Sequence, residues 1–434
     1  MKRIIFAIIL LLPIIVHSQQ IFTLEDLVRE SLLNNYSIKI GKVSEQIAEK
    51  NVNIGNAGML PRIDITRSFQ YSMTDLEIQL ATGQRIGSVD NITKTNNAGL
   101  QVGLTLFDGL AMFANFDKLK DLRERSKIEL KIMIETMTRE LALNYFNALK
   151  QESNMKILSS SLELHDKRIE RIRNRMEFGA ALNLELLRVQ VDKNTDSSSF
   201  MQSELAFTNF LRALNYLSGA NIIRQIQPDS VINFANLQNI DALRESMYEN
   251  NATLMRAVIN KEISEKDRKL VLAQFYPRIT ATAGYNYSRS EADAGFFLVN
   301  QSEGLAGGIN LQWNVMDGSR HIINAQNSKL MIEIQEINIE MVRANLDMLL
   351  HNMYENYSRR LAIYELEQSN IAIAQSNFDR TSEEYDLGRA TYIEFREAQL
   401  NLMRSQERIN NAKYDAKFAE IELQILTGTF QIAE

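Results

Sequence analysis

Residues 60–72 read LPRIDITRSFQYS and residues 276–288 read YPRITATAGYNYS, and these two stretches decide the fold. Six of the thirteen aligned pairs are identical, at a shift of 216 positions. In each stretch a proline stands just before a strand-like alternation of apolar and polar residues. Because proline breaks a helix and is tolerated at the start of a strand, Pro61 and Pro277 predict equivalent helix-to-strand junctions. The chain therefore contains an internal repeat.

The repeat extends over most of the chain, at a shift that changes once. Residues 99–109 (GLQVGLTLFDG) match residues 308–318 (GINLQWNVMDG) at a shift of 209, which persists to the end of both copies. The change of seven falls in 73–97 and 289–306, which predicts loops of unequal length there. The predicted organisation is a signal peptide over 1–18, a first repeat over 19–219, a linker over 220–238 and a second repeat over 239–434.

The first eighteen residues predict an export signal. Lys2 and Arg3 precede an apolar stretch that is too short to span a membrane, and small Ser18 ends a cleavage-site pattern; the alternative is an uncleaved anchor. Without this segment, 46 basic residues remain against 54 acidic ones, which argues against nucleic acid as a partner. There is no cysteine and the four histidines are scattered, so we expect no disulfide, no metal site and no cofactor.

Four strands are predicted, two in each repeat, at about 62–72, 99–107, 278–288 and 308–316. Each alternates strictly, so that apolar side chains collect on one face, and each has the length that crosses a bilayer when tilted. Four strands cannot close a barrel, and open edges are not tolerated in lipid, so closure requires several copies of the chain. Arg67 is the misfit on the apolar face. The alternative is a soluble sheet packed on helices.

Each repeat also predicts a long helix, a tight turn and another helix. The stretch 111–177 contains no proline and no glycine, and its apolar residues recur at alternating spacings of three and four, as in a coiled-coil seam. His165 falls on this seam. A helix of about 70 residues is about 105 Å long, too long for a compact domain of this size. Shorter helices are predicted at about 36–60 and 182–217.

Together these features resemble the outer-membrane efflux proteins of the TolC type. The resemblance rests on the duplicated helix–proline–strand unit, on Asp-Gly pairs at 108–109 and 317–318, and on two glycine turns. It implies a mainly α fold with a membrane β-barrel. A homotrimer would share twelve strands in one barrel in the outer membrane, continuous with a periplasmic α-helical barrel of twelve helices.

The resemblance also implies a function and partners. The chain would be the outer-membrane channel subunit of a tripartite efflux or type I secretion system, a passive exit duct embedded in outer-membrane lipid. Its expected partners are a periplasmic adaptor (membrane fusion) protein and an inner-membrane pump of the RND or ABC type. The turns expected to form the periplasmic tip, where the adaptor docks, contain Gly179, Ala180, Gly388 and Arg389; the alternative is that they only close helix hairpins.

The family's gate implies further residues at this tip. Its tyrosine, three positions before the second glycine, is Tyr385 here, and its acidic residue, six after the first glycine, is Glu185. We expect a hydrogen bond between them to help keep the tip closed. The family's arginine is absent, because that position is Ala390, and Arg389 is the expected substitute. The alternative for Tyr385 is an ordinary residue of the coiled-coil seam.

Glu394 and Glu397 are expected to form an acidic ring in the pore. They follow Gly388 by six and nine positions, where the family carries acidic residues at the tunnel entrance. Being three apart, they share one helix face. A ring of carboxylates attracts cations, and mutual repulsion should raise some of their pKa values. The first repeat has Arg188 at the position of the second acid, so only the second repeat would line the lumen. The alternative is two solvated helix residues.

The channel is weighed against proteins of other classes. The sequence contains no nucleophile motif, phosphate loop or metal cluster, so no catalytic residue is predicted and the chain is not expected to be an enzyme. The remaining alternative is a periplasmic or secreted coiled-coil scaffold or adhesin without a pore. The four alternating strands discriminate between the two, because a scaffold has no need of them.

Overall fold

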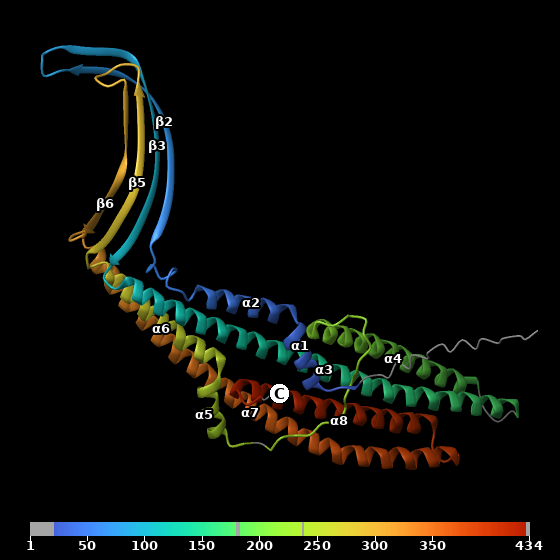
Figure 1. The fold of residues 1–434 in the computed structure, drawn as a ribbon. Coiled ribbons are helices and arrows are strands. Elements are labelled where there is room, and N and C mark those ends of the chain that lie inside the picture. Colours follow the sequence, from blue (N-terminus) through green and yellow to red (C-terminus); the bar gives the residue numbers. More distant parts are fainter. Residues whose placement is uncertain (1–20, 179–182, 237, 431–434) are drawn as a thin grey trace, which may run out of the picture. The chain divides into compact units, whose positions relative to one another are not determined.

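The computed structural model describes residues 21–178, 183–236 and 238–430. Over these ranges the chain is mainly helical, with one four-stranded sheet (Figure 1). None of the helices described combines the length and the apolar character that crossing a bilayer requires. The predicted signal peptide and the turn residues Gly179 and Ala180 lie outside the described residues.

The elements of the two repeats correspond in order. The first repeat contains α1 (Leu24–Asn34), α2 (Tyr36–Asn51), β2 (Arg62–Gln79), β3 (Arg85–Phe107), α3 (Ala111–Glu177) and α4 (Asn183–Ser218). The second contains α5 (Ile240–Asn250), α6 (Ala252–Ala273), β5 (Arg278–Ala292), β6 (Val299–Gln312), α7 (Arg320–Asp386) and α8 (Tyr392–Thr427). Both long helices have 67 residues and both helices that follow them have 36. The predicted helix over 111–177 is confirmed.

The chain divides into two compact units. The first unit holds the chain up to Gly41, with Leu130–Ala252 and Ala344 onward. The second unit holds Lys42–Glu129 and Thr253–Arg343. Each unit therefore takes matching segments from both repeats.

The sheet of the second unit is antiparallel, in the order β2–β3–β5–β6. Pro61 and Pro277 stand directly before β2 and β5, as predicted. The predicted loops over 73–97 and 289–306 are wrong, because both hairpins stay paired beyond the apolar alternation, as far as Gln79↔Arg85 and Glu291↔Val299. Backbone hydrogen bonds hold a ladder together without an alternating side-chain pattern. The last strand also ends at Gln312, short of the predicted 316.

Two turns in the second unit set the helix boundaries. After β3 and β6, the carboxylates of Asp108 and Asp317 accept a hydrogen bond from the backbone N–H four residues on, at 3.1 and 3.3 Å, and so cap α3 and α7. Gly109 and Gly318 follow with φ of 71° and 68°, where glycine is unstrained. By contrast, α2 ends at Asn51 and not near 60, and the chain after it turns through Gly58, whose φ is 90°.

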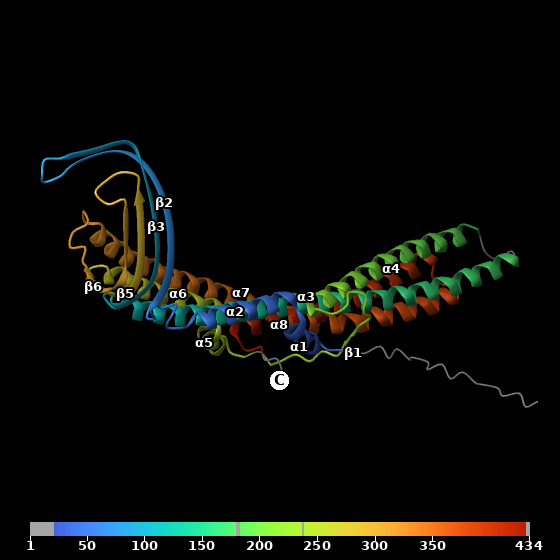
Figure 2. The same ribbon diagram turned by 45° about the horizontal axis from the view of Figure 1, so that its top comes forward.

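The first unit contains two helix hairpins, made by the later parts of α3 and α7 with α4 and α8, and α1 packs on α4 as α5 packs on α8 (Figures 1 and 2). An asparagine makes each of these packings in the same way. The side-chain N–H of Asn35 donates to the carbonyl of Leu217 at 2.7 Å, and Asn251 donates to Leu426 at 3.0 Å. Both amides are buried, so each bond satisfies a group that water cannot reach.

The predicted linker is tied to the core of this unit. Its strand β4 (Gln227–Pro228) pairs in parallel with β1 (Ile21–Phe22). The hydroxyl of Tyr145 donates to the carbonyls of Phe22 and Asp229, at 3.1 and 2.9 Å. Tyr145 belongs to the same hydrophobic core as fully buried apolar side chains from α1, α2, α3 and α4: Leu27, Ile38, Leu141, Leu149 and Leu214.

Candidate functional site

One face of the sheet is apolar and exposed in the single chain. Strand pairing places Ile65, Leu100, Tyr285 and Leu305 in one row across β2, β3, β5 and β6. Ile65 is 84% exposed and Leu305 is 88% exposed. Side chains on such a face lose nothing by contact with lipid and are costly in water. The row therefore has the properties of a surface that faces a membrane.

The opposite face of the sheet is polar, and its charged residues Arg62, Asp64 and Arg278 are confined to the helix end of the strands. Its serine, threonine and asparagine side chains are hydrogen-bonded across the strands. The hydroxyl of Ser288 donates to Asn97 at 2.7 Å, and the Thr95 and Ser290 hydroxyls lie 3.2 Å apart. An apolar outer face and a polar inner face are typical of a membrane barrel wall. The outer strands of this sheet are β2 and β6.

A second candidate site lies at the end of the first unit, where α7 turns into α8. Gly388 has φ of 74°, and the N–H of Arg389 donates to the carbonyl of Glu384 at 2.8 Å. A Cβ on Gly388 would meet nothing within 4 Å, so the left-handed backbone alone demands glycine. The matching turn of the first repeat lies outside the described residues.

Tyr385 and Glu185 meet at this end of the unit. The hydroxyl of Tyr385, at the end of α7, donates to Oε1 of Glu185, in the first turn of α4, at 2.8 Å. Burial, and then the bond to Glu185, raise the pKa of Tyr385 to about 12. Nη1 of Arg175 lies 4.0 Å from the same carboxylate oxygen. The hydrogen bond expected from the sequence is therefore present, and it joins the two hairpins.

Arg389 does not join this pair within one chain. Its side chain is 70% exposed and lies 4.0 Å from Glu384, on its own turn. Among the described residues, no contact links it to Glu185 or Tyr385. The hairpins are instead linked nearby by an ion pair between Arg171 and Asp386.

Glu394 is held by its own helix. Its Oε2 accepts hydrogen bonds from the backbone N–H of Thr391 at 2.7 Å and from its hydroxyl at 2.9 Å, while the Thr391 hydroxyl accepts from the N–H of Glu394 at 3.3 Å. This is a capping box at the start of α8. These bonds, the backbone one first, hold the pKa of Glu394 below its ordinary value. This lowering comes from bonds within one chain, and the rise expected from repulsion between the carboxylates of three copies stays a prediction.

A groove of about 660 Å³ runs between α4 and α8 beside the tip. Both helices contribute apolar side chains to it, and Val191 and Ile393 are 64% and 63% exposed. The charged residues that line it are Arg188, Asp192, Arg396, Glu397 and Arg404. The structure thus places Glu397 on this groove, three residues beyond the capping Glu394.

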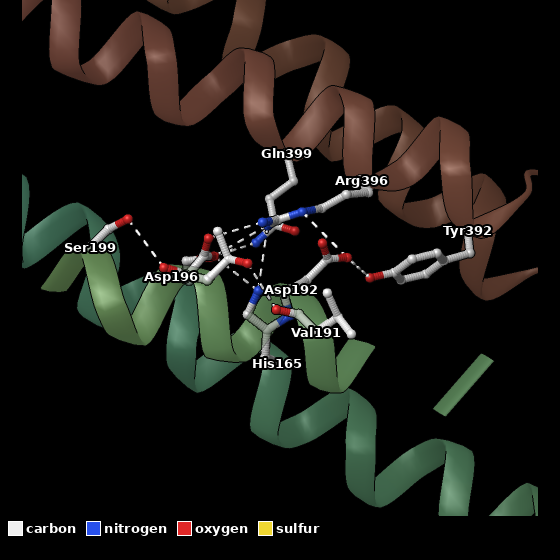
Figure 3. A network of polar contacts seen from close by, with 10 residues as sticks. His165, Val191, Asp192, Asp196, Ser199, Tyr392, Arg396 and Gln399 are labelled. Atoms are coloured by element: carbon white, nitrogen blue, oxygen red, sulfur yellow. Dashed lines mark hydrogen bonds and ion pairs between the residues drawn. The ribbon is translucent and has the colours of Figure 1, made fainter. Parts of the chain in front are cut away.

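A buried polar network joins α3, α4 and α8 next to this groove (Figure 3). At its centre, Asp196 accepts hydrogen bonds from the Ser161 hydroxyl at 2.6 Å and His165 Nε2 at 3.0 Å. The guanidinium of Arg396 binds both carboxylate oxygens, at 3.0 and 3.3 Å. Burial alone raises the pKa of Asp196, but the bonds from His165, Arg396 and Ser161 outweigh it and hold that pKa well below its ordinary value.

The network reaches Tyr385 through aromatic side chains. The Tyr392 hydroxyl donates to Asp192, on α4, one helical turn from the Asp196 site (Figure 3). The guanidinium carbon of Arg168 lies 3.1 Å from the ring centroid of Phe395 and 5.2 Å from that of Tyr385. Burial lowers the pKa of Arg168 to about 10. This cation–π packing holds the Arg168 guanidinium against the rings of Phe395 and Tyr385.

The sequence contains a recognisable signal for only one member of this network. His165 is a polar residue on an apolar seam, and a buried imidazole requires a hydrogen-bonding partner. That requirement predicts a partner but does not name it, because Asp196 and Arg396 come from other helices. In the part of the chain that the structure describes, no group of histidine and acidic side chains is arranged to hold a metal ion.

Comparison with known proteins places these features in context. A family model described as outer membrane efflux protein matches residues 27–220 and 243–429. The chain is similar to outer membrane protein TolC of Vibrio cholerae, at 18% identity over 359 residues, which is 81% of this chain and 82% of the relative. It is also similar to the cation efflux system protein CusC of Escherichia coli, at 20% identity over 422 residues, covering 93% and 85%.

Among solved structures, the fold is similar to that of the Campylobacter jejuni CmeC outer membrane channel. The TM-score is 0.76 at 15% sequence identity, over 95% of this chain and 87% of the other. The two ranges matched by the family model fall on either side of the linker.

Proposed function

Because the chain belongs to the outer membrane efflux protein family, a family of transport channels and not of enzymes, we propose that it is one subunit of a trimeric exit duct through the outer membrane, gated at its helical tip. The observation that carries the proposal is the amphipathic sheet. Its exposed apolar face suits lipid, its polar face suits a water-filled lumen, and it is open at β2 and β6.

The open edges argue for a shared barrel. A backbone N–H or C=O left unpaired in hydrocarbon costs several kcal/mol, so lipid-exposed edges are avoided by closing the sheet. Pairing of β6 in one copy with β2 in the next closes it, and three copies give a barrel of twelve strands. The helix hairpins of the same three copies then form a periplasmic barrel of twelve helices.

The gate is assigned to the contacts that join α3/α4 to α7/α8. The Tyr385–Glu185 hydrogen bond, the Arg171–Asp386 ion pair and the Asp196–Arg396 network all hold one hairpin against the other. Opening then consists of a movement of α7/α8 away from α3/α4, which requires these contacts to break. In the assembled trimer, the exposed Arg389 is free to reach a neighbouring copy.

The apolar part of the groove between α4 and α8 is the proposed docking place for the adaptor, and Glu397, which also lines the groove, is assigned to the pore entrance and not to this contact. Its exposed apolar side chains, including Val191 and Ile393, suit the apolar face of a helix in a helix-in-groove contact. The turns at Gly179–Ala180 and Gly388–Arg389 would complete this surface. The adaptor would connect the channel to an inner-membrane pump of the RND or ABC type. This assignment is supported by the similarity to CusC, which is named as part of an efflux system.

Glu394 and Glu397 are proposed to set the ion preference of the entrance. Both are exposed, and three copies would place six carboxylates around one opening. The lowered pKa of Glu394 keeps its charge in place at neutral pH.

The direct test is reconstitution of the purified full chain in planar bilayers. We expect the detergent-solubilised protein to have the mass of a trimer and to form discrete conductance steps. A scaffold or adhesin without a pore would give no conductance, and a stable monomer that conducts would contradict the shared barrel.

A further inference from the structure

Toward the hairpin ends, a belt of charged residues joins the apolar face of the sheet. Beyond the row of Ile65 and Leu305, toward the hairpin ends, the next row on the same face holds Arg67, paired through Ala98 and Tyr287 to Glu303. The two rows after it add further charges. The members of this charged belt are Arg67, Lys94, Arg289, Glu291 and Glu303, and all are exposed.

The belt lies toward the hairpin end of the apolar surface. On β5 the apolar face runs from Ile279 to Tyr285, six residues or about 20 Å along the strand at about 3.4 Å per residue, which is about 15 Å of height at the tilt of about 40° found in membrane barrels. An outward apolar band is about 25 Å tall in membrane barrels. Arg67, one row beyond Tyr285, therefore lies in the part of this band nearest the hairpin ends and not at mid-membrane, and the apolar face of β2 continues past it through Phe69 and Met73.

The belt is confined to the outer face. The rows that alternate with those of the belt point to the proposed lumen and carry only uncharged residues, among them Thr66, Ser68, Gln70, Asn97, Asn286 and Ser288. Solvation alone does not explain this distribution, because the lumen is also wet. Charges that are needed only on the lipid side suggest a charged partner on that side.

The cations differ in whether a partner is already present. Nε of Arg289 donates to Glu291 at 2.7 Å. Within the described residues, neither Arg67 nor Lys94 makes an ion pair or a side-chain hydrogen bond. In the ladder they lie on adjacent strands, four residues apart, which is about 14 Å. Arg289 lies diagonal to Lys94 on the next strand.

We propose that Arg67, Lys94 and Arg289 form a binding site for the phosphate groups of a lipid in the outer leaflet. Guanidinium and ammonium groups at a membrane surface are the usual ligands of phosphate headgroups. The spacing of Arg67 and Lys94 suits a headgroup with more than one phosphate. Tyr71 and Tyr287 lie on the same face and provide the aromatic contacts found at membrane interfaces. Each chain in a trimer would carry one site.

The orientation in this proposal rests on the proposed function. The helices α3 and α6 adjoin the opposite ends of the strands within the same unit, and in an outer-membrane channel with periplasmic helices the hairpin ends face outward. The site is then in contact with outer-leaflet headgroups.

The test is lipid binding by the purified full chain in detergent, followed by native mass spectrometry. The probes are diphosphorylated lipid A, the same lipid without phosphates, and inorganic phosphate as a competitor. We expect at least tenfold weaker retention of the dephosphorylated lipid. The triple variant R67Q/K94Q/R289Q should lose the preference for the phosphorylated lipid. Equal binding of the two lipids, or a triple variant that binds like wild type, would overturn the site.

A matched control removes two cations from the same sheet. The variant R62Q/R278Q changes arginines at the helix end of the strands, on the opposite face, and should bind lipid A like wild type. Full displacement by inorganic phosphate alone would show a free-phosphate site and would also overturn the lipid assignment.

The single variants R67Q and K94Q provide the test if the triple variant does not fold, and each should lose part of the preference for the phosphorylated lipid. Conductance of R67Q/K94Q/R289Q in planar bilayers separates the two proposals: a pore that lacks lipid preference supports the site, and absence of a pore in wild type would reject the channel.

Discussion

Glu185 and Glu394 occupy the same place in the two repeats and make different bonds. Each lies in the first turn of the helix that follows a tip turn. Glu185 accepts the hydroxyl of Tyr385 from the other hairpin, whereas Glu394 is bound by Thr391 of its own helix. The position equivalent to Thr391 in the first repeat is Leu182, which has no hydroxyl. A single residue three positions upstream therefore distinguishes a carboxylate that is bound within its own helix from one that is bound by the other hairpin.

The same asymmetry appears two residues further along. Arg396, which binds Asp196, corresponds at the shift of 209 to Leu187, which lines the α4–α8 groove. The duplicated fold thus places an ion pair on one hairpin and an apolar surface on the other. The repeat therefore specifies the scaffold, while single substitutions between its copies specify the contacts at the tip.

The largest effect is expected from making the second repeat resemble the first at the buried pair. Arg396→Leu leaves Asp196 buried with only His165 and Ser161 as partners. Removal of one partner of a buried ion pair costs about 3–5 kcal/mol. We expect a clear fall in the thermal unfolding midpoint of the helical signal, measured by circular dichroism.

The control for this variant is Arg389→Leu, which removes an exposed arginine near the same tip. Pairs of exposed charges contribute about 0–1 kcal/mol, so its midpoint should stay close to that of wild type. If Arg396→Leu and Arg389→Leu unfold at the same temperature, the network does not stabilise the tip.

The next effect concerns the hydrogen bond between Tyr385 and Glu185, which has no counterpart at Glu394. Tyr385→Phe combined with Glu185→Ala removes the hydroxyl and the carboxylate together. A hydrogen bond to a charged group contributes about 1.5–3 kcal/mol, and three copies act in a trimer. We expect a larger single-channel conductance in planar bilayers. Tyr216→Phe, which alters an exposed tyrosine on α4, serves as the control, and an unchanged conductance in the double variant would reject this gate.

A smaller effect should follow from giving the first repeat the cap of the second. Leu182→Thr places a hydroxyl three residues before Glu185, as Thr391 stands before Glu394. An N-terminal cap contributes about 1 kcal/mol, so the new cap should compete with Tyr385 for the carboxylate. We expect a conductance between those of wild type and the Tyr385/Glu185 double variant. Leu182→Val is the matched control without a hydroxyl, and equal conductance of the two variants would show that the cap does not compete.

Much of the scaffold can be predicted from the sequence, because the signals that specify it are local. Proline before a strand, an Asp-Gly pair after one, and a stretch without proline or glycine each act within a few residues. Pro61 and the helix over 111–177 show this. The extra length of the strands is less predictable, because β2 and β3 pair through polar residues that carry no apolar alternation.

The tip is harder to predict, because its contacts join helices that are distant in sequence. The Tyr385–Glu185 bond was accessible only through the family resemblance. The cap at Thr391 and Glu394 is visible in the sequence, since a threonine followed three residues later by glutamate is the capping-box pattern. The Asp196–Arg396 pair carries no such signal, because it depends on how α4 and α8 face each other.

The smallest effect is expected from the pH dependence of ion selectivity, in which Glu185 and Glu394 should again differ. If Glu394 and Glu397 line the entrance, wild type is cation-selective and Glu394→Gln with Glu397→Gln largely abolishes this, read as the reversal potential across a potassium chloride gradient. Hydrogen bonds from Thr391 lower the pKa of Glu394, so its charge persists as the pH falls from 7 to 5 and is lost only on further acidification through that lowered pKa. The cap it provides is lost in the same acidic range, because the group with the depressed pKa stabilises the fold only while ionised.

Thr391→Val removes the bonding hydroxyl and should move the loss of selectivity to higher pH, whereas Glu185→Gln should leave the selectivity unchanged. A Thr391→Val channel whose selectivity has the wild-type pH dependence would show that the cap does not control the charge at the entrance.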